Sequence, residues 1–269
     1  MTQETTGPEP GALDVRRVRT HHLREAKRRG ERFTMLTSYD ALTAGIFDAA
    51  GVDTLLVGDS AANNVLGYAT TLPVTVDELL PLCRAVSGAV ERALVVVDLP
   101  FGSYETSPEQ AVATGVRFLK EGGAWFAPHV EALVQAGVPV VAHVGFTPQS
   151  EHALGGYRVQ GRGDAAEALL ADARALEAAG AFSVLMEMVP AEAAAAVDAA
   201  LGVPTVGIGA GSATTGQVLV WQDMLGLRRG RLPRFVRQYA DLHGVVSEAV
   251  GRYVDDVRTG AFPGPEHSF

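Results

Sequence analysis

Short, apolar, β-rich runs that alternate with helical segments constrain the fold of this chain more than any other feature. Each run is apolar on both faces, which is typical of a parallel strand with helices on one side and a core on the other. Such alternation over 269 residues predicts a barrel or a doubly wound sheet. The predicted strands are Phe33–Thr37, Thr54–Gly58, Ala93–Asp98, Pro139–His143, Phe182–Glu187, Pro204–Ile208 and Gln217–Trp221.

One interval breaks this alternation. Helices in this chain end on Ala-Gly or Gly-Ala signals that lead directly into a strand, as at Ala179-Gly180. After Lys120–Ala124, however, the chain runs into Trp125–Gln135, which has helical spacing and carries Pro128 near its start. We therefore expect two helices to meet here, and a barrel that lacks its fourth strand and has seven instead of eight.

Composition narrows the class of partner. A formal charge of −9 and a pI near 5.3 leave no basic face to neutralise phosphates, so we expect a small-molecule partner and no nucleic acid. Cys83 is the single cysteine, which excludes an internal disulfide and is typical of a reducing cytosol. The basic stretch Arg16–Arg32 is predicted to be a helix with a solvated face that ends at Gly30.

The domain organisation is predicted to be simple. No Pro/Gly/Ser-rich linker divides the middle of the chain, so we expect residues 15–269 to form one barrel domain. Residues 1–14 are expected to form a disordered tail. This tail lacks the apolar segment of a signal peptide or a membrane span, and no membrane partner is expected.

Polar residues stand where the predicted strands end: Asp59, Ser60, Asp98, His143 and Glu187. In barrel enzymes the C-terminal ends of the strands hold the active site. Any one of these residues alone could be a helix cap or a loop contact. Their shared position in successive strands favours a functional site.

The residue types indicate a chemistry for this site. Two carboxylates without a cysteine suit Mg2+ better than zinc, and Asp59 and Asp98 are the candidate metal ligands. A metal there could chelate an α-keto acid and acidify the carbon beside its carbonyl. Glu187 lies in an apolar strand that could raise its pKa, as a general acid or base requires, although an ion pair with an Arg is an alternative. His143 could donate a hydrogen bond to a substrate oxygen or be a core histidine bonded to backbone.

The chain resembles the ketopantoate hydroxymethyltransferase family in motifs that occur in order from about Val15 onward. This resemblance implies a TIM-type (β/α)8 barrel of the phosphoenolpyruvate/pyruvate superfamily. It also implies a Mg2+-dependent enzyme of pantothenate synthesis that transfers a one-carbon unit from 5,10-methylenetetrahydrofolate to 3-methyl-2-oxobutanoate, giving 2-dehydropantoate. The motifs are Leu36–Asp40, Val57–Ser60, Thr71–Thr75, Asp98–Phe101, His143–Ser150, Gly155–Gly163, Gly207–Gly211 and Phe262–Phe269.

The resemblance assigns roles to individual residues. Asp59 and Asp98 match the family's metal ligands, and together with Ser60 they match its keto-acid contacts. Glu187 matches the family's proton acceptor, and His143 matches a residue that lines the same pocket. A cytoplasmic homodecamer built from two rings is also implied.

The chain departs from the family at one place. Between Ala124 and Phe126 the family has a further strand of the type Val-Lys-Leu-Glu-Gly-Gly, with a Lys for the keto-acid carboxylate and a Glu for the metal site. Loss of the Lys predicts keto-acid binding that is weaker by about one to two orders of magnitude.

Three hypotheses follow. The first is a hydroxymethyltransferase, impaired by the missing segment, and the second is a catalytically silent relative that acts as a structural or binding subunit. The third is a related Mg2+/α-keto-acid barrel of the phosphoenolpyruvate mutase and isocitrate lyase type. The chain lacks a Lys-Lys-Cys-Gly-His-like loop, which speaks against the lyase version.

Overall fold

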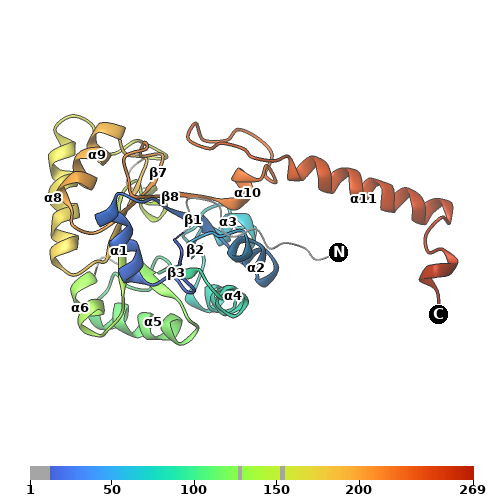
Figure 1. The fold of residues 1–269 in the computed structure, drawn as a ribbon, viewed down its shortest axis with the longest axis horizontal. Helices are drawn as coiled ribbons and strands as arrows, with labels where there is room; N and C mark the ends of the chain where they lie inside the picture. The colour runs from blue at the N-terminus through green and yellow to red at the C-terminus, as the bar shows by residue number, and fades with distance from the viewer. Residues whose placement is uncertain (1–12, 127–128, 152–154) are drawn as a thin grey trace. The chain divides into compact units, whose positions relative to one another are not determined.

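The computed structural model describes residues 13–126, 129–151 and 155–269. Eight parallel strands form a closed barrel in which each strand pairs with the next and β8 pairs with β1 (Figure 1). The predicted barrel class is confirmed. The strands are β1 Phe33–Thr37, β2 Thr54–Val57, β3 Leu94–Asp98, β4 Ala124–Phe126, β5 Val140–Gly145, β6 Ser183–Glu187, β7 Thr205–Ile208 and β8 Gly216–Leu219.

Helices connect the successive strands except β7 and β8, which the irregular segment 209–215 joins. Several begin at a side-chain cap: Thr75 and Ser107 accept hydrogen bonds from the first turns of α4 and α5. The helices are α1 Thr20–Arg29, α2 Ala41–Ala49, α3 Ala61–Asn64, α4 Val76–Ala89, α5 Pro108–Lys120, α6 Val130–Gln135, α8 Ala165–Ala178, α9 Ala191–Ala200, α10 Trp221–Met224 and α11 Leu242–Thr259, with short 3-10 helices η1 Pro148–Ser150 and η2 Pro265–His267.

The prediction that the fourth strand is absent was wrong. Ala124–Phe126, predicted to lead into a helix, forms the three-residue strand β4 instead, and α6 begins only at Val130. β4 pairs with β3 through the register Val96↔Ala124 and with β5 through Trp125↔Val140. The physical reason is that β3 and β5 would otherwise expose unpaired backbone groups at two edges. Closing the barrel therefore outweighs the local helical spacing.

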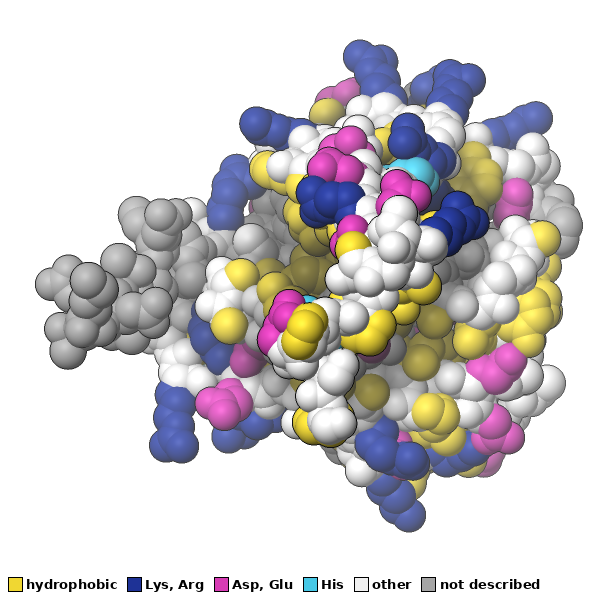
Figure 2. Space-filling view, turned by 90° about the vertical axis from the view of Figure 1, so that its right-hand side faces the viewer, with side chains coloured by type: hydrophobic (Ala, Val, Ile, Leu, Met, Phe, Trp, Pro, Cys, Tyr) yellow, Lys and Arg dark blue, Asp and Glu magenta, His cyan; other side chains and the backbone are white. Residues whose placement is uncertain are grey.

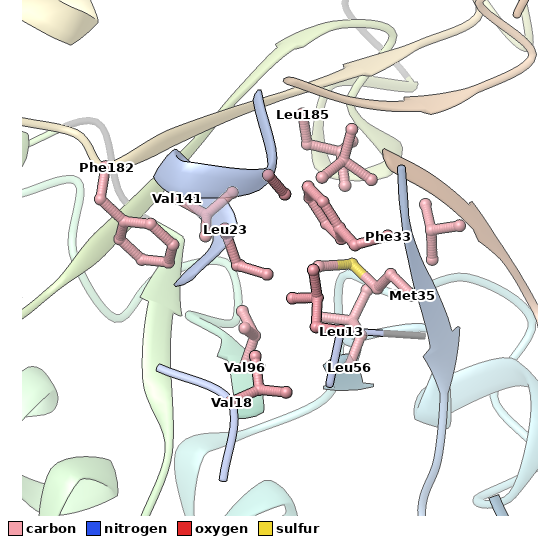
Figure 3. Close-up of a cluster of buried hydrophobic side chains, with 13 residues drawn as sticks. Leu13, Val18, Leu23, Phe33, Met35, Leu56, Val96, Val141, Phe182 and Leu185 are labelled. Carbon is pink, nitrogen blue, oxygen red and sulfur yellow. The ribbon is translucent and has the colours of Figure 1, made fainter. Parts of the chain in front are cut away.

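An apolar cluster closes the barrel at the N-terminal ends of its strands (Figure 3). Leu23 on α1 packs there with Phe33 at the start of β1 and with Val141 near the start of β5. Helix α1 ends at Gly30, whose left-handed backbone (φ 69) forms the cap, so the predicted helix end is confirmed. Burying a side chain such as Leu23 contributes about 1.5–3 kcal/mol to stability.

Leu13 belongs to the same cluster, which corrects the prediction of a disordered tail over residues 1–14. Its side chain is buried, and its backbone N–H donates to Asp53 Oδ1 at 3.1 Å. Arg92 holds this Asp53 oxygen at 2.6 Å and also donates to the Leu13 carbonyl. Residues 1–12 lie outside the described residues.

The chain divides into two compact units. The first ends at Leu219 and contains the barrel, and the second, Val220–Phe269, contains α10 and α11. Trp221, predicted to end the last strand, instead begins α10. Within the second unit, Asp241 caps α11 by accepting from the N–H of Gly244. That residues 15–269 form a single domain stays a prediction.

Two surface properties bear on partners. None of the helices within the described parts of the chain combines the length and apolar character that a membrane crossing requires. On the face that Figure 2 presents, Lys and Arg side chains stand among Asp and Glu side chains. Charges of both signs are therefore interspersed on that face.

Candidate functional site

The barrel brings all five predicted site residues to the C-terminal ends of its strands. Asp98 and Glu187 are the last residues of β3 and β6, and His143 lies within β5. Asp59 follows β2, and Ser60 stands at the beginning of α3. Because the strands are parallel, these ends meet at one mouth of the barrel.

The two aspartates are joined by a backbone contact. The N–H of Asp59 donates to Asp98 Oδ2 at 2.8 Å. Gly58 permits this approach, since a Cβ at that position would lie 2.8 Å from Ser60 Oγ and 3.3 Å from Asp98 Oδ2. The glycine therefore lets the turn after β2 fold closely over the end of β3.

Burial makes ionisation of this pair unfavourable. It raises the pKa of Asp98 well above its ordinary value, and the nearby charge of Asp59 adds to the rise. Burial also raises the pKa of Asp59, against a hydrogen bond from Gln149. No Lys or Arg side chain of the described residues compensates either carboxylate. Two buried carboxylates without a cationic partner provide a place where a positive charge would be stabilised.

The donor set can be compared with the predicted magnesium ion. Over the described ranges, no group of three or more His, Cys, Asp and Glu side chains is placed to hold a metal ion. Mg2+ commonly takes only one or two protein carboxylates and completes its shell with water and substrate oxygens. Asp59 and Asp98 fit such a hydrated hard cation, whereas they do not fit zinc, which takes three or four protein ligands of the His and Cys type.

Glu187 has the properties of a general acid or base. Burial raises its pKa to about 8, and the negative charges of Asp59 and Asp98 add to this rise. Near neutral pH the carboxyl group is therefore mostly protonated, and a smaller ionised fraction can act as the base. Met188, directly after it, has a positive φ of 50°, which is a strained conformation for a side chain of this size and is typical of functional sites.

His143 lies next to Glu187, with Nε2 3.5 Å from Glu187 Oε2. The distance would allow an ion pair, but burial lowers the pKa of His143 to about 4. Since burial also favours the neutral form of Glu187, both groups are largely neutral near neutral pH. His143 also forms a hydrogen bond with the backbone of Phe146, as expected of a core histidine, and its contact with a substrate oxygen stays a prediction.

Ser60 is held by an aromatic neighbour that sequence reasoning did not single out. The hydroxyl groups of Tyr39 and Ser60 lie 2.8 Å apart, and Tyr39 is buried just after β1. Burial raises the pKa of Tyr39 to about 12, so the phenol keeps its proton. This contact orients the Ser60 hydroxyl beside Asp59.

Gln149 and Tyr104 are two further residues without a predicted role. Gln149, on η1, donates from Nε2 to Asp59 Oδ2 at 3.1 Å and to the Leu99 carbonyl at 2.9 Å. The Tyr104 hydroxyl donates to Gln149 Oε1. Gln149 stands within the motif His143–Ser150, which is the only signal that could have indicated it, and nothing local marks Tyr104.

The chain is similar to proteins of known family. Residues 17–265 match the family model for ketopantoate hydroxymethyltransferase. A relative in Arthrobacter sp. (strain FB24), named 3-methyl-2-oxobutanoate hydroxymethyltransferase, is 69% identical over 95% of this chain and 88% of the relative. A relative of the same name in Corynebacterium glutamicum is 56% identical over 96% of this chain and 99% of its own length.

Solved structures share the fold at low sequence identity. Phosphonopyruvate hydrolase in complex with oxalate and Mg2+ is 14% identical with a TM-score of 0.60, and 93% of each chain is covered. A 2,3-dimethylmalate lyase of the phosphoenolpyruvate mutase/isocitrate lyase superfamily is 20% identical with a TM-score of 0.58, covering 91% of this chain and 89% of the lyase. These likenesses show the TIM-type fold alone.

Proposed function

The chain belongs to the ketopantoate hydroxymethyltransferase family and is a transferase, and we propose that it acts on 3-methyl-2-oxobutanoate with 5,10-methylenetetrahydrofolate as co-substrate. The products are 2-dehydropantoate and tetrahydrofolate, and the reaction is a step of pantothenate synthesis. The observation that carries this proposal is the buried pair Asp59 and Asp98, with Glu187 close enough for their charges to raise its pKa.

In the proposed site, Asp59 and Asp98 hold a Mg2+ ion. The ion supplies electrophilic polarisation of the keto carbonyl when it is bound. Ser60, oriented by Tyr39, donates a hydrogen bond to the keto acid, and neutral His143 provides a second polar contact in the same pocket. These contacts hold the substrate with its C3 hydrogen toward Glu187.

Glu187 performs the proton transfer in this proposal. The C3–H bond breaks, the proton moves to the Glu187 carboxylate, and the electron pair stays with the substrate as an enolate. Water adds to the methylene carbon of the folate, and both of its carbon–nitrogen bonds break, so that the two nitrogens of tetrahydrofolate take the protons of the water and the one-carbon unit is released as formaldehyde. The enolate carbon C3 then forms a bond to this carbon, the electrons of its C=O bond move to the oxygen, and that oxygen takes the proton back from Glu187 to give the new hydroxyl group. The apolar surroundings of β6 keep the base from being solvated as strongly as in water.

The short fourth strand supports a second candidate function. β4 consists of Ala124, Trp125 and Phe126, so it contains neither the Lys nor the Glu that the family resemblance places there. A catalytically silent subunit that keeps the barrel is therefore the alternative to an impaired enzyme.

We also propose a cytoplasmic homodecamer that binds neither nucleic acid nor membrane. The single reduced Cys83 supports the cytoplasm, and the net charge of −9 supports the absence of nucleic acid. Leu42 and Ile46 on α2 are 82% and 65% exposed, and such adjacent apolar side chains support self-association. Sedimentation of the purified protein tests the assembly, and a monomer would contradict it.

The test of the function follows exchange of the C3 hydrogen of 3-methyl-2-oxobutanoate for deuterium by proton NMR, with Mg2+ and without folate. Exchange that EDTA abolishes supports the enzyme, and formation of 2-dehydropantoate after folate addition identifies the full reaction. A folded protein that shows neither exchange nor product is the silent subunit.

A further inference from the structure

The side-chain amide of Gln149 connects three parts of the barrel mouth. It extends from η1, after β5, to Asp59 at the end of β2 and to the Leu99 carbonyl at the end of β3. Its third partner, Tyr104, lies in the loop between β3 and α5. Asp59 and Gln149 are 90 residues apart in the chain, so this contact exists only in the closed barrel.

The partners determine the orientation of the amide. Asp59 Oδ2 and the Leu99 carbonyl are both acceptors, so the NH2 group must face them and uses one N–H on each. The reversed orientation would place Oε1 against two acceptors. Oε1 is thereby directed to Tyr104, whose hydroxyl donates to it. Both donors and the acceptor oxygen of the amide are therefore used in one arrangement.

We propose that Gln149 is a positioning residue for the Asp59 carboxylate, and that Tyr104 acts through Gln149 by holding its amide in place. The amide bonds to Asp59 Oδ2 and, together with the side chain of Thr71 and the backbone of Ser60, which also bond to this carboxylate, restricts its orientation for the cation and keto acid. This inference rests on the proposed function in one respect, since it assumes that Asp59 is a metal ligand. It adds two residues to which no role in the reaction has been assigned.

A purely structural role for Gln149 makes a different prediction. A tether that only fastened η1 to β3 would affect stability and loop order, and it would leave metal affinity unchanged. A positioning residue instead changes the cation affinity of the folded protein. The two roles are therefore separated by binding measurements at matched stability.

The variants are Gln149→Met, which keeps the length of the side chain but removes all its hydrogen bonds, and Tyr104→Phe, which removes one hydroxyl. Gln135→Met is the matched control, because Gln135 is exposed on α6 and, among the residues that the structure describes, its side-chain amide donates only to Glu131. Thermal unfolding of each variant without metal shows that it is folded.

The first measurement is the affinity of the substrate-free protein for Mn2+. Electron paramagnetic resonance detects the bound Mn2+, and Mg2+ is added as a competitor. Loss of a hydrogen bond to a charged group predicts an affinity about tenfold to a hundredfold lower in Gln149→Met. Tyr104→Phe is expected to lower it by about threefold to tenfold, because a neutral hydrogen bond is weaker. In the double variant the Tyr104→Phe change should add nothing, since the amide through which it acts is absent.

The second measurement is C3 exchange as a function of Mg2+ concentration. In Gln149→Met the Mg2+ concentration for half-maximal exchange should rise, while the rate at saturating Mg2+ returns to within about threefold of the unchanged protein. A structural tether would give no such separation.

The outcomes distinguish failure of the positioning role of Gln149 from failure of the proposed transferase function. Unchanged Mn2+ affinity in folded Gln149→Met overturns the positioning role, and so do additive effects in the double variant. Weakened Mn2+ binding in a protein that catalyses no exchange supports the positioning role and overturns the proposed function. A protein that binds no Mn2+ and catalyses no exchange overturns both.

Discussion

Exchange of the C3 hydrogen should depend on pH through the ionisation of Glu187. Burial, followed by the charges of Asp59 and Asp98, raises the pKa of Glu187 to about 8, so most of the base carries a proton at neutral pH. Below this pKa its active form falls about tenfold per pH unit, so a pKa of about 8 gives a rate near pH 6 that is about a hundredfold below its plateau, which is the upper limit for the Mg2+-bound protein. A cation bound by the aspartates offsets their charge, so the midpoint with Mg2+ should lie below 8.

The same shift predicts how metal-free stability depends on pH. Because the pKa of Glu187 is raised from 4.5 to about 8 on folding, the native state binds more protons than the unfolded state between these values. The free energy of unfolding should therefore be highest below about pH 4.5 as far as this group is concerned. This stabilising contribution is lost as the pH rises through about 8, and the total decrease in the free energy of unfolding from this group is at most about 5 kcal/mol.

Glu187→Gln tests both statements. Without the base, exchange should fall by about 10²- to 10⁴-fold, and the decline of metal-free stability between about pH 4.5 and 8 should become shallower. Glu167→Gln, on the exposed side of α8, is the control for loss of one carboxylate. Proton NMR follows exchange, and urea unfolding at each pH measures stability. Wild-type exchange in Glu187→Gln, or a pH-independent rate in the unchanged protein, would refute the assignment of Glu187 as the base.

Three further predictions concern the aspartates and the closed end of the barrel. Asp98→Asn should raise the Tm of the metal-free protein, because it removes a buried charge beside Asp59. The same change should abolish the rise in Tm on adding Mg2+, and a rise in Tm that is retained in this variant contradicts the assignment of Asp98 as a metal ligand. Leu23→Ala should cost about 2–5 kcal/mol in urea unfolding because Leu23 is buried under the barrel, and a loss below about 1 kcal/mol would show that the cluster is dispensable. Arg92→Met leaves the fully buried Asp53 without its cationic partner and should lower the free energy of unfolding by about 3–5 kcal/mol. Adding Asp53→Asn to this variant should restore part of the lost stability, because the unpaired charge is then removed.

The amino-acid sequence by itself determined the approximate positions of seven of the eight strands and the polar residues at their ends. Strands such as Phe33–Thr37 are recognisable because their apolar character and helical flanks are local properties, and β1 occupies those same residues. Asp98 and Glu187 could be predicted as site residues because a strand's last residue must lie at the mouth of a parallel barrel. The sequence also showed that no Lys or Glu stands in β4.

Tertiary structure decided what depends on partners distant in the chain. Ala124–Phe126 became a strand because β3 and β5 each offered a backbone edge, a nonlocal gain that outweighed local helical spacing. Leu13 is buried because Asp53 and Arg92 bind its backbone. The raised pKa of Glu187 and the contact from Gln149 to Asp59 likewise arise only when separate strands meet at the barrel mouth, since burial and charge proximity are properties of the folded arrangement.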